Sequence, residues 1–203
     1  MVTQADFIAA QHLNTLRKQL RKQRRAVNKF QHKQSELKVL QQLLLFAPFR
    51  SSQKIGLYLD AFGEIHTANI IRACFRLKKT VFLPKICNMN GRLIWVKITA
   101  HQYNNQRFTQ HRLGMQEPAA ERAHSVSHLD VLFMPLLGCD RKGTRLGMGG
   151  GYYDRTLASA EHRPIRVGIA HNFQLLDKNL EQRPWDQPLD FLVTPKRLYR
   201  FKP

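Results

Sequence analysis

The most constraining feature of this sequence is a nearly continuous apolar run at residues 130–138, DVLFMPLLG, closely followed by a glycine-rich segment. A strand that is apolar on both faces is typical of the centre of a parallel sheet, because helices cover both sides of such a sheet. The glycines at 143–151 predict a loop near the point where this strand ends. We therefore expect a central strand, then a glycine loop, then a helix from about Tyr152.

Other parts of the chain alternate between strand and helix patterns. Short runs rich in β-branched and aromatic residues predict further strands at 54–60, 80–84, 92–98, 165–171 and 190–195. Amphipathic spacing predicts helices at about 34–47, where Pro48 stops the helix, and at 67–78. Residues 99–128 are polar and predict a long loop with a helical turn around 119–124. This alternation favours an α/β fold, a three-layer sandwich with a mainly parallel sheet.

Length and composition narrow the class of protein. The 203 residues are enough for one domain, 1–203, and the hydrophobic share of 43% is ordinary for a globular protein. No apolar stretch approaches the ~20 residues that a membrane span needs, and no signal peptide is visible. The three cysteines have no CxxC spacing, which argues against a disulfide framework and a zinc site. We expect a cytoplasmic monomer without membrane association.

Positive charge is concentrated near the N-terminus. The chain has 33 lysines and arginines against 14 acidic residues, a formal net charge of +19. No acidic residue lies between Phe7 and Ser35, and leucines at helical spacing predict an amphipathic helix over about 13–33 with a basic outer face. Such a face is either simply solvated, or it recognises phosphate, carboxylate or nucleic acid.

The segment from Gly143 to Arg155, GTRLGMGGGYYDR, carries the clearest chemical signal. Glycines let the backbone approach a ligand closely, and successive free N–H groups at the start of a helix form an anion site. Arg145 and Arg155 add charge-assisted donors for phosphate. The Walker A pattern is absent, and the Rossmann spacing fails at Tyr152. A tight turn alone would explain one or two of the glycines, so a phosphate loop beside Asp154 is favoured.

These residues resemble a known family. The run DRKGTRLGMGGGYYD at 140–154 is similar to the signature of 5-formyltetrahydrofolate cyclo-ligases, also called methenyltetrahydrofolate synthetases. The segments LRKQLRKQRRA, EIHT and FLPK occur in the family's order and spacing. The resemblance covers about residues 13–195.

The resemblance implies an ATP-dependent ligase that converts 5-formyltetrahydrofolate, with or without a polyglutamate tail, to 5,10-methenyltetrahydrofolate. ADP and phosphate are released, and Mg²⁺ is required. The implied chemistry phosphorylates the formyl oxygen, after which the folate N10 attacks the activated carbon and phosphate leaves. A formamide oxygen is a poor leaving group until it is phosphorylated, so the protein's share is positioning and charge neutralisation.

The same resemblance implies roles for individual residues. Arg145 and Asp154 are the implied catalytic residues, and Asp154 and Asp186 the implied Mg²⁺ ligands, with Asp190 as an alternative to Asp186. The implied ATP contacts are Arg17, Arg21, Arg145, Leu146, Gly147, Met148, Gly149, Gly150, Gly151, Tyr152 and Tyr153. The implied folate contacts are Leu59, Glu64 and Tyr152. Leu13 stands where family members commonly have a lysine or arginine.

Several of these residues also have plainer interpretations. Glu64 can cap the helix that follows it, Asp186 can be a turn residue, and Leu59 can belong to the core. The alternative function is a non-catalytic basic protein that binds nucleic acid on the same fold, and the charge alone predicts weak, non-specific binding at low salt. No RNP-like, zinc-finger or KH motif is present, and nucleic-acid binding leaves Asp154 beside the glycine loop unexplained, so the enzyme is favoured.

Overall fold

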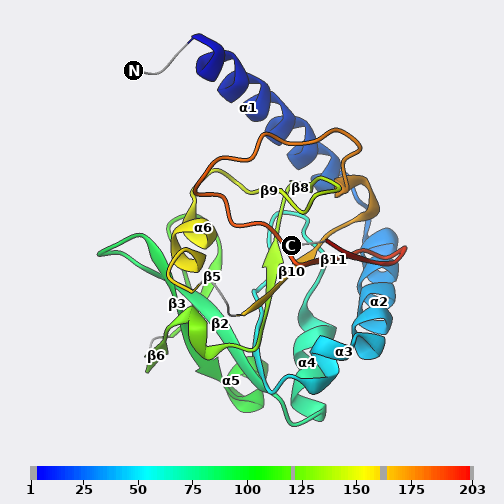
Figure 1. Cartoon of the computed structure of the whole chain (residues 1–203). Coiled ribbons are helices and arrows are strands. Elements are labelled where there is room, and N and C mark those ends of the chain that lie inside the picture. The colour runs from blue at the N-terminus through cyan, green and yellow to red at the C-terminus, as the bar shows by residue number, and fades with distance from the viewer. Residues whose placement is uncertain (1–3, 120–121, 161–163, 202–203) are drawn as a thin grey trace.

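The computed structural model of this chain describes residues 4–119, 122–160 and 164–201. An eight-stranded sheet in the order β12-β11-β10-β7-β1-β2-β3-β6 forms its middle layer (Figure 1). The strands of this sheet are β1 (Lys54–Gly56), β2 (Thr80–Cys87), β3 (Arg92–Ile98), β6 (Ala123–His124), β7 (Val131–Pro135), β10 (Ile165–Ile169), β11 (Phe191–Val193) and β12 (Leu198–Arg200). Two small ribbons consist of β4 (Phe108–Gln110) with β5 (Gln116–Pro118), and of β8 (Gly138–Cys139) with β9 (Arg145–Leu146).

The helices connect these strands and cover the sheet. The α-helices are α1 (Gln4–Arg25), α2 (Lys29–Leu45), α3 (Ala47–Ser51), α4 (Ala68–Arg76), α5 (Ala100–Asn104) and α6 (Tyr152–Leu157), and the 3₁₀ helices are η1 (Val126–His128) and η2 (Asn172–Gln174). None of the helices in the described ranges is long and apolar enough to cross a membrane.

The inner strand pairs are parallel and the outer ones antiparallel. β7 lies between β1 and β10, with Ile55 opposite Val131 and Val167 opposite Phe133. β10 also pairs in parallel with β11, and β1 with β2, whereas β3, β6 and β12 run antiparallel to their neighbours. The predicted α/β fold is confirmed, and the central strand expected at 130–138 is β7, which ends earlier, at Pro135.

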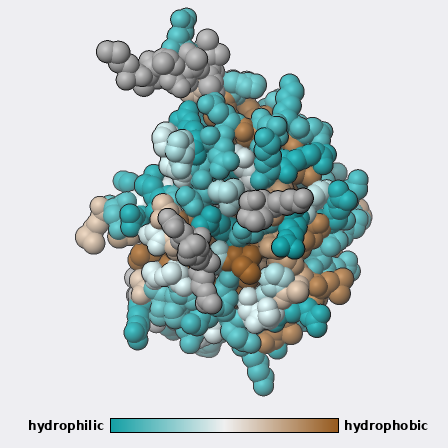
Figure 2. All heavy atoms as spheres, viewed as in Figure 1, coloured by the Kyte–Doolittle hydropathy of each residue, from teal (hydrophilic) through white to brown (hydrophobic). Residues whose placement is uncertain are grey.

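Burial of β7 on both faces explains its continuous apolar sequence. Val131 and Phe133 belong to a core between the sheet and the helices α2, α3 and α4. Leu132 and Met134 belong to a second core on the opposite face, to which α6 contributes Leu157. Helices therefore lie on both sides of the sheet, which makes the three layers that were expected. The face in Figure 2 is largely hydrophilic, with apolar residues only in small groups.

α1 projects from the body of the molecule, and its C-terminal half packs near β8 and β9 (Figure 1). There Leu20 forms a small cluster with Leu137 and Leu146. The basic helix was expected over 13–33, but it starts earlier and ends at Arg25. The reason is a capping box at the start of α2, in which the Asn28 side chain accepts from Gln31 N and the Gln31 side chain accepts from Asn28 N.

Three further elements differ from the prediction. α2 ends at Leu45 before Pro48, and Pro48 lies in the first turn of α3, where its missing N–H has no helical partner to lose. The predicted strand at 54–60 pairs regularly only over β1, after which the chain leaves the sheet. The C-terminal segment TPKRLYRFKP at 194–203 is basic and was not predicted to form a strand beyond residue 195, yet it supplies β12.

The polar segment 99–128 is not one long loop. It contains α5, begun by a capping box between Thr99 and Gln102, then the β4–β5 ribbon, β6 and η1. The helical turn expected around 119–124 is wrong at Ala123–His124, which pair with β3. Residues 120–121 lie outside the described ranges. These short strands are mostly polar, so the apolar alternation that identifies strands is missing.

Candidate active site

A cleft of about 1490 Å³ lies at the carboxyl end of the parallel strands. Its walls include Tyr58 and Leu59 after β1, Pro84 in β2, and Pro135 and Leu136 at the end of β7. α1 and the loop between β9 and α6 also line it. Ligand pockets commonly measure ~300–1,000 Å³, so this cleft has room for two ligands side by side.

The glycine loop, residues 147–151, borders this cleft. Gly149 and Gly151 have φ angles of 104° and 64°, in the region that favours glycine, and Gly151 immediately precedes α6. The loop follows the β8–β9 ribbon rather than β7 directly, a detour that the sequence pattern did not predict. Arg155, expected to bind phosphate, lines the cleft and also holds the loop in place, since its Nη2 donates to Gly150 O at 2.7 Å and to Gly91 O at 3.0 Å.

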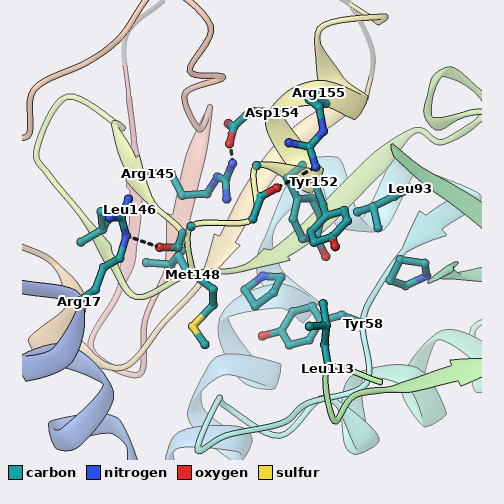
Figure 3. Close-up of a pocket in the computed structure, with 18 of the residues that line it drawn as sticks. Arg17, Tyr58, Leu93, Leu113, Arg145, Leu146, Met148, Tyr152, Asp154 and Arg155 are labelled. Atoms are coloured by element: carbon teal, nitrogen blue, oxygen red, sulfur yellow. Dashed lines mark hydrogen bonds and ion pairs between the residues drawn. The ribbon is translucent and has the colours of Figure 1, made fainter. Parts of the chain in front are cut away.

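An ion pair lies beside the loop (Figure 3). Arg145 Nη2 donates to Asp154 Oδ1 at 2.6 Å, and the two side chains are 4% and 22% exposed. The guanidinium lies 5.5 Å from the centre of the Tyr153 ring, and its buried Nε has no hydrogen-bond partner among the described residues. Asp154 Oδ1 also accepts from Gln187 N at 3.2 Å. The unpaired Nε of Arg145 can donate to a ligand phosphate, and the partly exposed carboxylate of Asp154 can bind the cation that accompanies it.

α1 brings positive charge to the same end of the cleft. Arg17 Nε donates to Gly147 O at 3.2 Å, which fixes the helix against the glycine loop. Burial lowers the pKa of Arg17, and the nearby charges of Arg21 and Arg183 lower it further. A bound anion would relieve this repulsion.

Arg21, a predicted ATP contact, is not among the residues that line the cleft. Its Nε donates to Arg17 O at 3.3 Å, so the side chain folds back along its own helix. Leu13 does line the cleft, one turn before Arg17, and it packs on the Leu20 cluster. Leu13 therefore faces the cleft like Arg17, although family members commonly have a lysine or arginine at this position.

The other predicted nucleotide and metal positions come together. The cleft is lined by Leu146, Gly147, Met148, Gly149, Gly150, Gly151, Tyr152, Tyr153, Asp154 and Asp186. Asp190 does not line it, because its side chain accepts from Arg166 N at 2.7 Å at the start of β10. Of the two alternatives for a second carboxylate, Asp186 alone reaches the cleft.

Asp154 and Asp186 suit a hard cation that ligand phosphates help to hold. No group of three or more His, Cys, Asp and Glu side chains in the described ranges is arranged to hold a metal ion. Mg²⁺ is commonly bound through one or two carboxylates together with substrate phosphates, so two carboxylates beside a glycine loop fit this ion.

Glu64 lies in the cleft wall among mostly buried groups. Its Oε1 accepts from Arg24 Nη1 at 3.3 Å and its Oε2 accepts from Ala61 N at 3.1 Å, and the side chain is 11% exposed. Burial raises the pKa of Glu64 to about 7, although the Arg24 charge and the Ala61 N–H act to lower it. The plainer interpretation as a helix cap is wrong, since Asp60 accepts from Thr67 N at the start of α4.

Two residues of this region were missed in the sequence. The Tyr58 hydroxyl is buried and has no hydrogen-bond partner in the part of the chain that the structure describes. Burial raises the pKa of Tyr58, and the charge of Glu64 raises it further, so the hydroxyl stays protonated. Arg24, which seemed one of many solvated cations, is fully buried at 0% exposure. A tyrosine just beyond a strand was a usable signal, but nothing local distinguishes Arg24 from its neighbours.

Apolar side chains form much of the remaining lining. Leu93, Leu113, Met115 and Met148 all face the cleft, and Figure 3 shows Leu93 and Leu113 on the Tyr58 side, away from Arg17. Leu113 and Met148 are 50% and 45% exposed. Half-exposed apolar side chains inside a cleft suit an aromatic ligand. The cleft thus combines a cationic end with an apolar wall that contains a buried acceptor.

A family model described as the 5-formyltetrahydrofolate cyclo-ligase family matches residues 9–195. The chain belongs to this family. Among cyclo-ligase relatives, the Escherichia coli (strain K12) protein named 5-formyltetrahydrofolate cyclo-ligase is 32% identical over 186 residues, which is 90% of this chain and 100% of that protein. The Haemophilus influenzae protein of the same name is 34% identical over 182 residues, 88% of this chain and 95% of that one.

Solved structures of cyclo-ligase relatives have the same fold. The structure of Aquifex aeolicus 5,10-methenyltetrahydrofolate synthetase superposes with a TM-score of 0.80 at 26% identity, covering 94% of this chain and 93% of that one. The Mycoplasma pneumoniae 5,10-methenyltetrahydrofolate synthetase gives a TM-score of 0.70 at 23% identity, covering 90% and 98%. The latter likeness concerns the fold alone.

Proposed function

We propose that this chain catalyses the ATP-dependent closure of 5-formyltetrahydrofolate to 5,10-methenyltetrahydrofolate, with release of ADP and phosphate. The observation that carries the proposal is the composition of one large cleft. It joins a glycine loop with the Arg145–Asp154 pair to an apolar wall that contains the buried Glu64. Family membership supports the reaction, and the volume of the cleft is sufficient for both substrates.

The test is a direct assay of the purified chain. It would be incubated with 5-formyltetrahydrofolate and MgATP while the absorbance of the methenyl product and the release of ADP are followed. We expect stoichiometric formation of both. A folded chain that forms no methenyl product in the presence of ATP would contradict the proposal.

In this proposal the nucleotide occupies the cationic end of the cleft. Arg145, Arg17 and the backbone of the glycine loop bind the phosphates, which places the terminal phosphoryl group toward the folate. The formyl oxygen receives that group, N10 of the folate attacks the activated carbon, and phosphate leaves. The chain's own residues orient the two substrates and neutralise charge, which is where phosphoryl-transfer enzymes gain most of their rate.

Asp154 and Asp186 are the residues proposed to hold Mg²⁺. When bound, the ion neutralises charge on the ATP phosphates. Asp154 has a second task that needs no ion: it fixes the Arg145 guanidinium through the 2.6 Å hydrogen bond.

The folate would lie along the apolar wall and meet Glu64. Leu59 and Tyr152 line the same cleft and are proposed folate contacts. The N–H groups of the pterin need an acceptor, and the carboxylate of Glu64 is a buried one. The Tyr58 hydroxyl, which lacks a partner in the described part of the chain, is a further polar atom that a ligand can satisfy.

The cysteines are not proposed to take part. Cys74 and Cys139 are fully buried, and burial raises the pKa of the Cys74 thiol to about 12. Cys87 is partly buried, and none of the three is among the residues that line the cleft in the described structure. The proposed chemistry needs no covalent nucleophile, so this arrangement is compatible with it.

Folate binding should depend on pH through Glu64. With a pKa of about 7, the carboxyl is largely protonated at about pH 6 and ionised at about pH 8. Because a ligand N–H requires the anion, affinity should fall as pH falls, by up to about tenfold per pH unit below the pKa. Calorimetric titration of 5-formyltetrahydrofolate without ATP measures this. In Glu64→Gln we expect weaker binding that no longer changes over this range. An unchanged pH slope in the variant would assign the titration to another group.

The alternative, a nucleic-acid-binding function, is not favoured by the family. Weak non-specific binding remains a prediction from the charge. Lys18, Lys22 and Lys29 are exposed and do not line the cleft, whereas Arg24 is buried and does not belong to this basic face. Changing the three lysines to glutamine should abolish RNA binding at low salt and leave cyclisation intact. The matched control changes the exposed lysines Lys38, Lys78 and Lys97. Tight, salt-resistant binding of one RNA with little catalysis would favour the alternative.

A further inference from the structure

Arg24 is buried at a junction of three parts of the chain. Its Nε donates to Phe62 O at 3.0 Å, and its Nη1 donates to Leu136 O at 3.2 Å and to Glu64 Oε1 at 3.3 Å. Its Nη2 lies 3.9 Å from the sulfur of Met148 in the glycine loop. Only 1% of the side chain is exposed. A charge is costly to bury, so a guanidinium held in this way needs all of these acceptors.

The turn at 62–64 is pressed against the last turn of α1. Phe62 has a φ of 52° and Gly63 a φ of 81°. A Cβ at Gly63 would lie 2.6 Å from Arg24 O, so only glycine permits this approach. A non-glycine residue such as Phe62 keeps a left-handed backbone only where its surroundings enforce it. Here the hydrogen bond from Arg24 to Phe62 O is one such constraint, and it acts two residues before Glu64.

Arg24 also provides the cationic partner of Glu64. The other groups that act on this carboxyl are the Ala61 N–H, which donates to it, and the charge of Asp60 in the same segment. Glu64 in turn raises the pKa of both Tyr58 and Tyr153, which places these two hydroxyl-bearing rings near it. Among these groups Arg24 is the cation: burial raises the pKa of Glu64, and the charge of Arg24 lowers it.

We propose that Arg24 is a positioning residue for folate binding, because its guanidinium holds Glu64 and the 62–64 turn in the geometry that accepts a ligand N–H. This inference rests on the proposed function, in which Glu64 binds the folate. Arg24 is itself part of the cleft wall, but its Nε and Nη1 are used on Phe62, Leu136 and Glu64, and its Nη2 faces the Met148 sulfur, so its proposed role is to hold these groups in place. The role is separate from that of Arg17 and Arg145, which serve the nucleotide.

The experiment measures binding of 5-formyltetrahydrofolate by calorimetry across pH, in the absence of ATP. Arg24→Gln removes the opposing charge, so the pH midpoint of binding should move upward by about 1–3 units. Arg24→Lys keeps the charge but cannot reach all three acceptors, so the midpoint should stay while affinity falls roughly tenfold. The control Lys22→Gln removes an exposed charge from the same helix and should change neither.

A double-mutant cycle with Glu64→Gln decides whether Arg24 acts through Glu64. In the Glu64→Gln background, Arg24→Gln should change folate affinity by less than about twofold, since the group it positions is gone. If Arg24→Gln does not fold, the cycle is run with Arg24→Lys. Fully additive effects, or a folded Arg24→Gln protein whose midpoint does not move, would overturn the inference. A wild-type chain without cyclisation activity would instead contradict the proposed function.

Discussion

Replacing Asp154 with asparagine is expected to lower turnover by roughly 100-fold or more while leaving the fold intact. Asp154 is proposed to bind the cation and to fix Arg145. Its Oδ1 accepts a hydrogen bond from Arg145 Nη2 at 2.6 Å. An amide carries no charge, so it neither attracts a divalent cation to the phosphates nor balances the arginine. Turnover would be measured across a Mg²⁺ titration, with a melting curve as the check on folding.

The chain offers a matched control for this change. Asp177 also accepts from an arginine, Arg141, at 2.7 Å, but its side chain is 86% exposed and lies outside the cleft. Asp177→Asn should leave turnover and its Mg²⁺ dependence unchanged, because exposed pairs of this kind contribute little. If Asp154→Asn also turned over normally at every Mg²⁺ concentration, neither proposed role of Asp154 could stand.

The features that the sequence predicted well are those determined by local requirements. A strand buried on both faces must be apolar along its length, so Val131–Pro135 was recognisable and proved central. A loop that must adopt positive φ next to a helix needs glycine, so the segment before Tyr152 was recognisable as well. The position of the cleft beside this loop followed from the same pattern, and Arg17 and Arg145, which line the cleft, followed from the resemblance.

The features that were missed depend on distant parts of the chain. Arg24 is one of eight cations along 17–33, and what selects it for burial is a carbonyl 112 residues away, Leu136 O. Arg155 is similar, since its acceptor Gly91 O lies 64 residues away in the β2–β3 turn. Helical periodicity cannot distinguish such residues from solvated neighbours. The break between α1 and α2 is different, because the Asn28–Gln31 capping box was present in the sequence and was overlooked.

The second large effect is expected at Arg145. Replacing it with alanine should raise the KM for ATP by roughly 10- to 150-fold, since a lost charge-assisted phosphate contact costs about 1.5–3 kcal/mol. The side chain is 4% exposed and lies over Tyr153, so water cannot easily replace it. Arg145→Lys keeps the charge but lacks the planar guanidinium, so its KM for ATP should lie between that of the wild type and that of Arg145→Ala. Initial rates at varied ATP and saturating folate give these values.

Arg141→Ala is the control, because it removes an exposed arginine from the comparable surface pair with Asp177.

The Arg145 and Asp154 variants should also combine less than additively. Each single change leaves the partner in a half-buried site without its counter-charge, and the double change removes both charges together. A cycle of the four proteins measures this coupling, with kcat/KM for ATP as the quantity compared. Additive losses would show that the two residues act independently, and an unchanged KM for ATP in Arg145→Ala would remove Arg145 from the nucleotide site.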